Sequence, residues 1–179
     1  MVCTAPITAV IGSVFPSATY NQVVRDNLLQ TMPALTTTLG SFFATVGTHQ
    51  IAERVPMSDY DSGSSTTSST SYTDLPSGVG PTVTCRTGTI AAIFLYCNQD
   101  NTTTAIPDAC WMALEISGAT TQAASDSFAL QLQGQAGQHS GAPFLIDTLT
   151  PGINTFTAKF RVSAGTGLFS SRRLAVWPF

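Results

Sequence analysis

The chain has 179 residues and carries little charge: 9% of its residues are charged, against about 25% in an ordinary globular protein. With a net charge of −3 it has no basic stripe that suits a nucleic-acid backbone, since its densest group of cations is the pair Arg172 and Arg173. No run approaches the 18 consecutive apolar residues of a transmembrane helix. We therefore expect neither nucleic acid nor a membrane as a partner.

The first predicted element is a short amphipathic helix over about 18–31. Ser17 is a suitable N-cap, and a proline follows the segment. Tyr20, Val24 and Leu28 recur at spacings of four residues and form one apolar stripe. A lone helix of about four turns is marginal in water. We therefore expect this stripe to dock on another surface.

A small β hairpin is predicted next, over about 39–55, from two β-prone pieces around the turn "VGTHQ". Together with the helix it makes an N-terminal arm of residues 1–57. The Ser/Thr-rich stretch 58–71 reads as a linker or as an extended edge. The main domain boundary is expected within that stretch.

Residues 72–179 are predicted to be all β, because short β-prone runs alternate with turn signals at the spacing of a sandwich or barrel. In the clearest run, "NTFTAKFRVS", apolar residues alternate with Thr, Lys and Arg, so one face is core and the other faces water. The predicted strands are "TSYTDL", "TVTCRT", "TIAAIFLYC", "CWMALEIS", "FALQLQG", "PFLIDTL", "NTFTAKFRVS", "GLFS" and "RLAVWPF".

Two of these runs are apolar on both faces. One is "TIAAIFLYC"; the other is the last, which places Leu174 and Val176 on one side and Trp177 and Phe179 on the other. A strand that is apolar on both faces is covered on both faces, and no predicted helix is left to cover this sheet. We therefore expect another subunit to cover it and assign these four residues to a subunit interface.

The four cysteines do not form a metal motif: none lies in a CxxC pair, and the chain has only two histidines. Cys97 and Cys110 lie at the end of one predicted strand and at the start of the next. Facing each other across a hairpin, they would form a disulfide. Small buried thiols are the alternative.

Catalytic chemistry is not predicted. The segment "GQHSG" at 137–141 has a histidine where a nucleophile elbow has its serine, and we expect it to be a loop. Glu115 lies inside an apolar strand, where it would either pair with Arg161 or Arg86 or be exposed at an edge. We expect no enzymatic activity, no metal and no cofactor.

Several segments resemble virion proteins of tailed bacteriophages. "LTPGINTFTAKFRVSAGTGLFSSRRLAVWPF" resembles the closing strands of their jelly-roll domains, and "SGATTQAASDSFAL" resembles the middle of those domains. "SATYNQVVRDNLLQTMP" is similar to an N-terminal helix of such proteins. "TTLGSFFATVGTHQIAERVP" is similar to the knob that links phage fibre arms to their heads. The matches occur in order and cover most of the chain.

The resemblance implies a homotrimeric virion protein, exposed on the extracellular particle, with an attachment arm and a head at 72–179 that is an antiparallel jelly-roll β-sandwich. The expected function is capsid decoration or cement, with Tyr20, Val24 and Leu28 docking the arm on the capsid shell protein. Leu174, Val176, Trp177 and Phe179 would then pack around the threefold axis.

The alternative is the receptor-binding head of a tail fibre or tail tip, bound to a tail protein and recognising a host cell-wall glycan. Its binding surface would be the polar loops 98–109 and 134–142. The chain lacks a long shaft repeat, which favours a compact knob over a long fibre.

Overall fold

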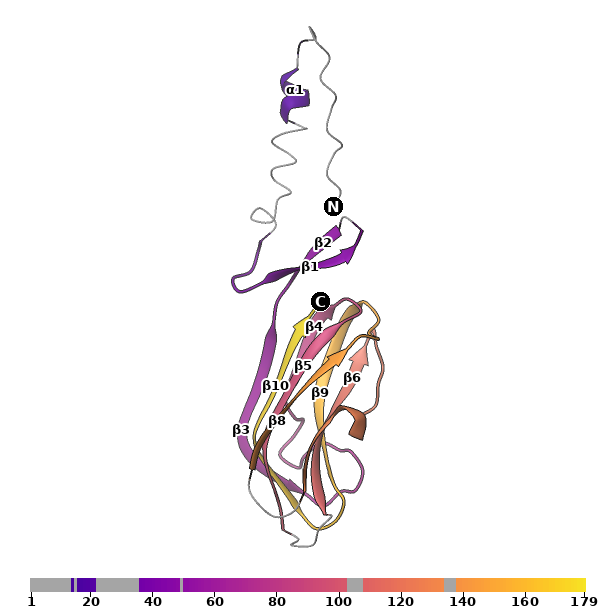
Figure 1. Cartoon of the computed structure of the whole chain (residues 1–179). Helices are drawn as coiled ribbons and strands as arrows, with labels where there is room; N and C mark the ends of the chain where they lie inside the picture. The colour runs from indigo at the N-terminus through magenta and orange to yellow at the C-terminus, as the bar shows by residue number, and fades with distance from the viewer. Residues whose placement is uncertain (1–13, 15, 22–35, 49, 103–107, 134–137) are drawn as a thin grey trace. The chain divides into compact units, whose positions relative to one another are not determined.

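The computed structural model describes residues 14, 16–21, 36–48, 50–102, 108–133 and 138–179 (Figure 1). The chain divides into two units, Met1–Val55 and Pro56–Phe179. The boundary therefore falls just ahead of the Ser/Thr-rich stretch in which the sequence places it.

In the first unit, helix α1 (Ser17–Tyr20) is a single turn. Pro16, in an extended conformation, takes the N-cap position expected for Ser17. Tyr20 is exposed, whereas Val24 and Leu28 lie outside the described residues. Within the part of the chain that the structure describes, no helix has the length and apolar composition to cross a membrane.

Strands β1 (Phe42–Gly47) and β2 (Gln50–Arg54) pair antiparallel in the range where the sequence predicts a hairpin. The Glu53 carboxylate on β2 binds the segment 37–41, which precedes β1. It accepts hydrogen bonds from Ser41 Oγ at 2.6 Å and from the backbone N–H groups of Thr37 and Thr38 at 2.9 and 2.8 Å. The Thr37 hydroxyl donates to the same carboxylate, and together these bonds, that from Ser41 first, hold the pKa of Glu53 at about 2.

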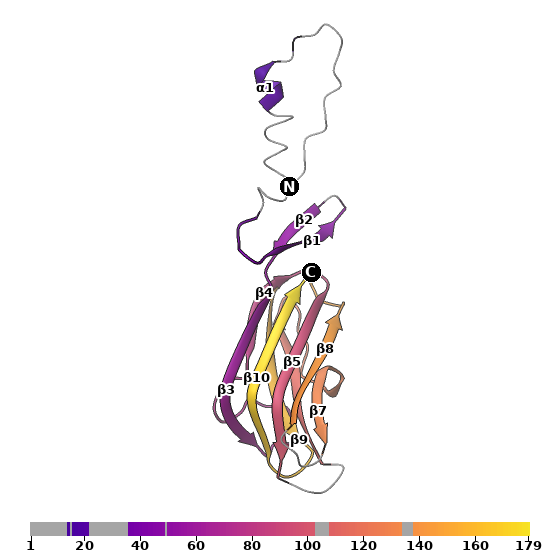
Figure 2. The ribbon, with the colours of Figure 1, turned by 60° about the vertical axis from the view of Figure 1, so that its left-hand side comes forward.

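The second unit consists of two four-stranded antiparallel sheets (Figure 1, Figure 2). The spatial order in the first sheet is β3 (Met57–Thr67), β10 (Gly167–Pro178), β5 (Ala91–Asn101) and β8 (Gln138–Ile146). The order in the second is β4 (Thr82–Thr87), β9 (Gly152–Val162), β6 (Ala109–Gly118) and β7 (Ala129–Gln133). A 3₁₀ turn, η2 (Asp126–Phe128), precedes β7. This unit is mainly β and antiparallel, as the sequence predicts.

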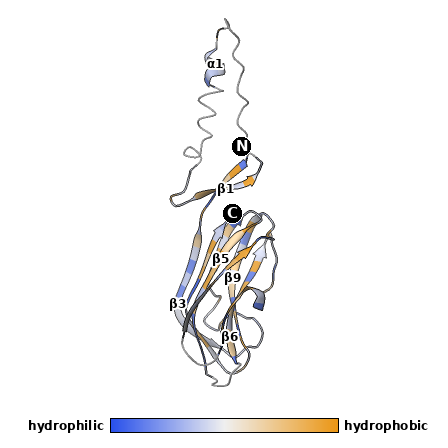
Figure 3. Cartoon of the chain, in the orientation of Figure 1, coloured by the Kyte–Doolittle hydropathy of each residue, from blue (hydrophilic) through white to orange (hydrophobic). Residues whose placement is uncertain are grey.

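A shared apolar core joins the two sheets, and both contribute alternate residues to it. Hydrophobic and hydrophilic positions are interspersed along the strands (Figure 3). On β9, Phe156, Ala158 and Phe160 are fully buried, in the alternation that the sequence predicts. The ring of Phe160 packs edge-on against that of Phe169 on β10, with centroids 5.0 Å apart.

The Ser/Thr-rich stretch forms β3, an edge strand hydrogen-bonded to β10. This corrects the division into a linker at 58–71 and a head that begins at 72, and agrees with the other interpretation, an extended edge. Small hydroxyl side chains suit an edge strand, which has water on one side of its ladder. The expected strand "TSYTDL" is instead an irregular segment, with Thr73 in an isolated bridge to Phe160.

The disulfide considered between Cys97 and Cys110 is not formed, and both thiols are free and buried. The two strands are consecutive in sequence but belong to opposite sheets, so the cysteines do not face each other across a hairpin. Each thiol donates a hydrogen bond to a carbonyl oxygen, Cys97 to Asn98 and Cys110 to Asp100, both at 3.3 Å. Burial raises the pKa of Cys97 to about 12 and that of Cys110 to about 11.

Candidate functional site

The outer side of the sheet β3-β10-β5-β8 carries large apolar side chains that are open to solvent. We call Tyr60, Phe94, Tyr96, Leu145 and Trp177 the aromatic face; each is between 37% and 66% exposed. Single exposed apolar residues are ordinary, but a contiguous group of this kind marks a contact surface.

Strand register places these residues on three consecutive rungs of one face. Residues directly opposite each other on neighbouring strands project to the same side of a sheet. The rungs are Leu145–Ala92–Trp177, Pro143–Phe94–Ala175 and Gly141–Tyr96–Arg173–Tyr60. The face is therefore continuous across all four strands and carries one charge within these rungs, on Arg173.

Arg173 is itself part of the aromatic surface. Its guanidinium lies 4.9 Å from the centroid of the Tyr60 ring, in a cation–π contact. Tyr60, Tyr96, Ser171 and Arg173 line a shallow hollow of about 380 Å³. The hollow therefore combines aromatic side chains with the charge of Arg173.

A bulge in β10 sets which residues reach this face. The ladder shifts register between Ser170 and Arg173, and Ser171 has a φ of 51°. Phe169 and Leu174 both point into the core, although they are five positions apart and strict alternation would place them on opposite sides. The extra residue restores the phase. It also explains why the sequence reads as two strands, "GLFS" and "RLAVWPF", where the structure has one.

The residues predicted for the subunit interface divide into two pairs. Leu174 and Val176 are fully buried in the core of their own unit, so they cannot contact another subunit directly. Trp177 and Phe179 are 49% and 39% exposed, and Trp177 belongs to the aromatic face. Sequence reasoning did not single out the other members of the face, although the two-sided apolar run "TIAAIFLYC" contains Phe94 and Tyr96.

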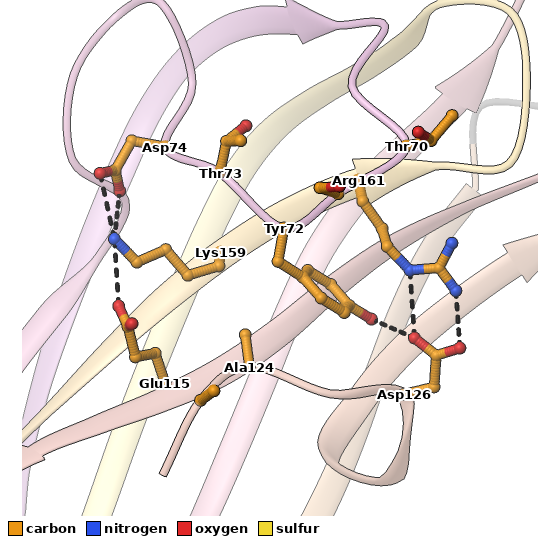
Figure 4. A pocket seen from close by; sticks show the side chains of 11 residues that line it. Thr70, Tyr72, Thr73, Asp74, Glu115, Ala124, Asp126, Lys159 and Arg161 are labelled. Atoms are coloured by element: carbon orange, nitrogen blue, oxygen red, sulfur yellow. Dashed lines mark hydrogen bonds and ion pairs between the residues drawn. The ribbon is translucent and has the colours of Figure 1, made fainter. Parts of the chain in front are cut away.

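The opposite sheet carries a different kind of site, an open pocket of about 730 Å³ that we call the polar pocket (Figure 4). Lys159 and Arg161 project from β9 into it. The segment that follows β3 runs beside them, because Thr73 exchanges two backbone hydrogen bonds with Phe160, at 3.0 and 2.9 Å. The pocket is lined by Thr70, Ser71, Tyr72, Thr73, Asp74, Glu115, Ala123, Ala124, Asp126, Lys159 and Arg161.

Lys159 lies between two carboxylates at one side of the polar pocket. Its Nζ is 2.9 Å from Asp74 Oδ1 and 3.1 Å from Glu115 Oε2. Burial lowers the pKa of Lys159, but the hydrogen bonds with the two carboxylates outweigh burial and raise it. The sequence suggested Arg161 or Arg86 as the partner of Glu115, and the structure shows Lys159 instead.

Arg161 lies at the other side of the pocket, where it holds Asp126 by two hydrogen bonds, Nε–Oδ1 at 3.1 Å and Nη2–Oδ2 at 2.6 Å. The hydroxyl of Tyr72 donates to the same carboxylate at 2.7 Å. Bonds from Arg161 and Tyr72 lower the pKa of Asp126. Burial and the neighbouring Asp126 raise the pKa of Tyr72. The Trp111 ring lies under the guanidinium of Arg161, with its centroid 3.7 Å away.

The remaining predicted sites are placed only in part. Of the two polar loops proposed for receptor binding, residues 103–107 and 134–137 lie outside the described residues. Residues 98–101 belong to β5, 109 to β6 and 138–142 to β8, so these parts are strands and not loops. In the described ranges, no three His, Cys, Asp or Glu side chains gather closely enough to hold a metal ion.

The second unit thus consists of two antiparallel sheets, with the aromatic face on one and the polar pocket on the other. No protein-family model matches the chain, and no curated protein sequence is significantly similar to it.

Proposed function

We propose that this protein is a structural component of a bacteriophage particle, a homotrimer that decorates or cements the capsid and docks on the shell protein by its N-terminal arm. The aromatic face is the observation that carries the proposal. The assignment to a virion and the threefold symmetry come from the sequence resemblance.

The strand order supports a jelly roll for the head. Four pairings, β3 with β10, β4 with β9, β5 with β8 and β6 with β7, nest inside one another along the chain. This is the pattern of a long antiparallel ribbon that is folded in half. The further pairings β10–β5 and β6–β9 wrap the ribbon into two sheets, as expected of a jelly roll.

The aromatic face supports association with further copies of the same chain. Its apolar rungs leave water on assembly, at roughly 25 cal/mol for each Å² of apolar surface that is buried. Aromatic side chains dominate the centres of stable interfaces. Among its rungs Arg173 carries the only charge, and its guanidinium already lies against the ring of Tyr60. The attraction between the cation and the electron-rich face of the ring offsets part of the cost of removing Arg173 from water.

Sedimentation equilibrium of the intact chain tests the trimer. We expect three times the 18.8 kDa chain mass for the wild type, and monomers for a variant that combines Phe94→Ser and Trp177→Ser. Ile153→Ser is the matched control, because Ile153 is 49% exposed on the other sheet. A monomeric wild type, or a trimer that survives the double substitution, contradicts the role of this face.

A cryo-EM map of the intact particle tests the location. Trimeric knobs repeated across the shell would support decoration. Density confined to the tail tip or to fibre ends would contradict it and would support the alternative, a receptor-binding head for a host cell-wall glycan.

A further inference from the structure

We propose that the polar pocket is a binding site for a neutral saccharide. This inference does not depend on the proposed function: the pocket lies on the sheet opposite the aromatic face, and its residues belong to one subunit. It also differs from the polar loops considered for receptor binding, because none of its lining residues comes from those loops.

The size and openness of the pocket suit a small part of a larger polar chain. Its volume of about 730 Å³ falls among the ligand sites of proteins, which span roughly 300–1,000 Å³. Most such sites are mainly apolar, whereas hydroxyl and charged groups line this one. A ligand that fits here must therefore carry many hydrogen-bonding groups.

Hydrogen-bonding capacity remains unused on the pocket walls. Thr70, Ser71 and Thr73 contribute three side-chain hydroxyls, and Glu115 contributes its Oε1 oxygen. None of these four groups makes a hydrogen bond to another described residue, since the interactions of Glu115 use Oε2. Each hydroxyl can donate and accept, and the carboxylate oxygen can accept. Together they match the paired donors and acceptors of sugar hydroxyl groups.

The charges of the pocket favour a neutral ligand over an ionic one. Lys159 already contacts two carboxylates, and Arg161 holds Asp126 through two hydrogen bonds. An anion would have to displace one of the three carboxylates, and a cation would have to compete with Lys159 or Arg161 for them. A neutral hydroxyl group binds at the edge of an ion pair without breaking it.

The same ion pairs fix the walls before a ligand arrives. Figure 4 shows Tyr72 between the two ion groups, with its hydroxyl directed at Asp126 and Ala124 nearby. Trp111 supports Arg161 from below. Side chains that are already held in place lose little conformational entropy on binding. The Tyr72 ring and Ala124 supply apolar surface against which the C–H groups of a sugar ring can pack.

The test is a glycan array that carries neutral, anionic and amino-sugar oligosaccharides, probed with the intact chain and followed by titration calorimetry on the neutral oligosaccharide that gives the strongest signal. Ala123→Trp fills the pocket without touching an ion pair, and we expect it to weaken binding at least tenfold. Thr121→Trp places the same side chain two residues away, outside the lining, and should leave binding unchanged.

Ala123→Trp could also weaken binding by disturbing its loop, so a second variant changes the pocket at a strand residue. Glu115→Gln keeps the shape of the side chain and leaves Lys159 paired with Asp74. It removes the ion pair between Glu115 and Lys159 and replaces the free carboxylate oxygen by an amide group, so binding should weaken severalfold. Because that ion pair is partly exposed to solvent, the melting temperature should change little. The proposal is overturned if no neutral oligosaccharide binds, if binding is confined to anionic or amino sugars, or if both pocket variants bind as the wild type does.

The oligomeric state is measured on the same samples. A monomer that binds sugar contradicts only the proposed trimer, and a trimer that binds no sugar contradicts only this inference.

Discussion

Arg172 and Arg173 are neighbours in the chain but lie on opposite sides of the sheet. Arg172 is 1% exposed, and its Nη2 lies 2.5 Å from Asp61 Oδ2. Arg173 points outward onto the ring of Tyr60. The bulge at Ser170–Arg173 shifts the alternation of β10 by one residue. As a result, Phe169 before the bulge and Leu174 after it both face the core. Arg172 thus belongs to the interior and Arg173 to the aromatic face.

Removal of the carboxylate at Asp61 should destabilise the fold, because it leaves the guanidinium of Arg172 buried without a counter-charge. We expect Asp61→Ala to lower the free energy of unfolding by about 2–4 kcal/mol, the range for breaking a buried pair after allowance for the partial exposure of Asp61. Urea denaturation of the wild type and of Asp61→Ala measures the difference in the free energy of unfolding.

Arg172→Met provides the complementary test, since it removes the buried charge instead of its partner. An apolar side chain of similar volume is often neutral or stabilising at such a position. Asp147→Asn, an exposed carboxylate on the loop after β8, is the control and should change stability by less than about 0.5 kcal/mol. Equal stability of Asp61→Ala and Asp147→Asn would contradict the pairing.

The bulge also marks the limit of what the sequence predicts about the fold. Alternation in "NTFTAKFRVS" and "TVTCRT" predicts β9 and β4, because each strand keeps one phase along its length. In "GLFSSRRLAVWPF" the phase changes at Ser171, and no local pattern distinguishes a bulge from a turn between two strands. The pairing of Ser/Thr-rich β3 with β10 was equally hidden, because its stabilisation comes from backbone hydrogen bonds and not from apolar side chains.

Gly167 should not tolerate a side chain. A Cβ at this position would lie 2.6 Å from Val162 Cγ1 and 2.9 Å from Cys110 Sγ, closer than packed atoms allow. We expect Gly167→Ala to lower the free energy of unfolding by about 1–3 kcal/mol, as overpacking does. Thermal melting followed by circular dichroism measures the loss.

Gly141→Ala is the matched control for that prediction. Its added Cβ would meet its nearest neighbour, the Leu95 carbonyl oxygen, at 3.5 Å, an ordinary contact. It should leave stability within about 0.5 kcal/mol of the wild type. If Gly167→Ala and Gly141→Ala have the same melting temperature, the packing around Gly167 is looser than the structure indicates.

The pocket was harder to predict than the fold. The alternation of β9 places Lys159 and Arg161 on the solvent side, which sequence reasoning recognised. Their carboxylate partners come from three separate segments, at Asp74, Glu115 and Asp126. Two of these lie in irregular chain or in η2, where no periodicity fixes the register. Pairing across such distances follows from the sheet order, which the sequence does not reveal.

The Arg161–Asp126 pair should contribute stability that depends on pH. The pKa of Asp126 is lower in the folded protein than in the unfolded chain, so its contribution is present above the unfolded value of about 3.9 and is lost as the pH falls through the folded value. Asp126 is largely exposed, so the contribution is about 1 kcal/mol or less. Melting temperatures of the wild type and Asp126→Asn should therefore differ at pH 7 and converge towards pH 2. A difference that is the same at both pH values would contradict this origin.

Cys97 and Cys110 should resist thiol reagents until the protein unfolds. Both are fully buried, and burial raises their pKa values to about 12 and about 11. Because the thiolate is the reactive form, few molecules are reactive at pH 8 even where the reagent has access. We expect labelling by an aromatic disulfide reagent to be slow in native buffer and fast in 6 M guanidinium chloride, with mass spectrometry used to assign the labelled sites.

The two thiols share the interior, so Phe160→Ala, which opens space in the same core, should accelerate labelling of both. Rapid native labelling, or an intact mass that shows Cys97 and Cys110 already joined, would contradict free thiols sealed between the two sheets.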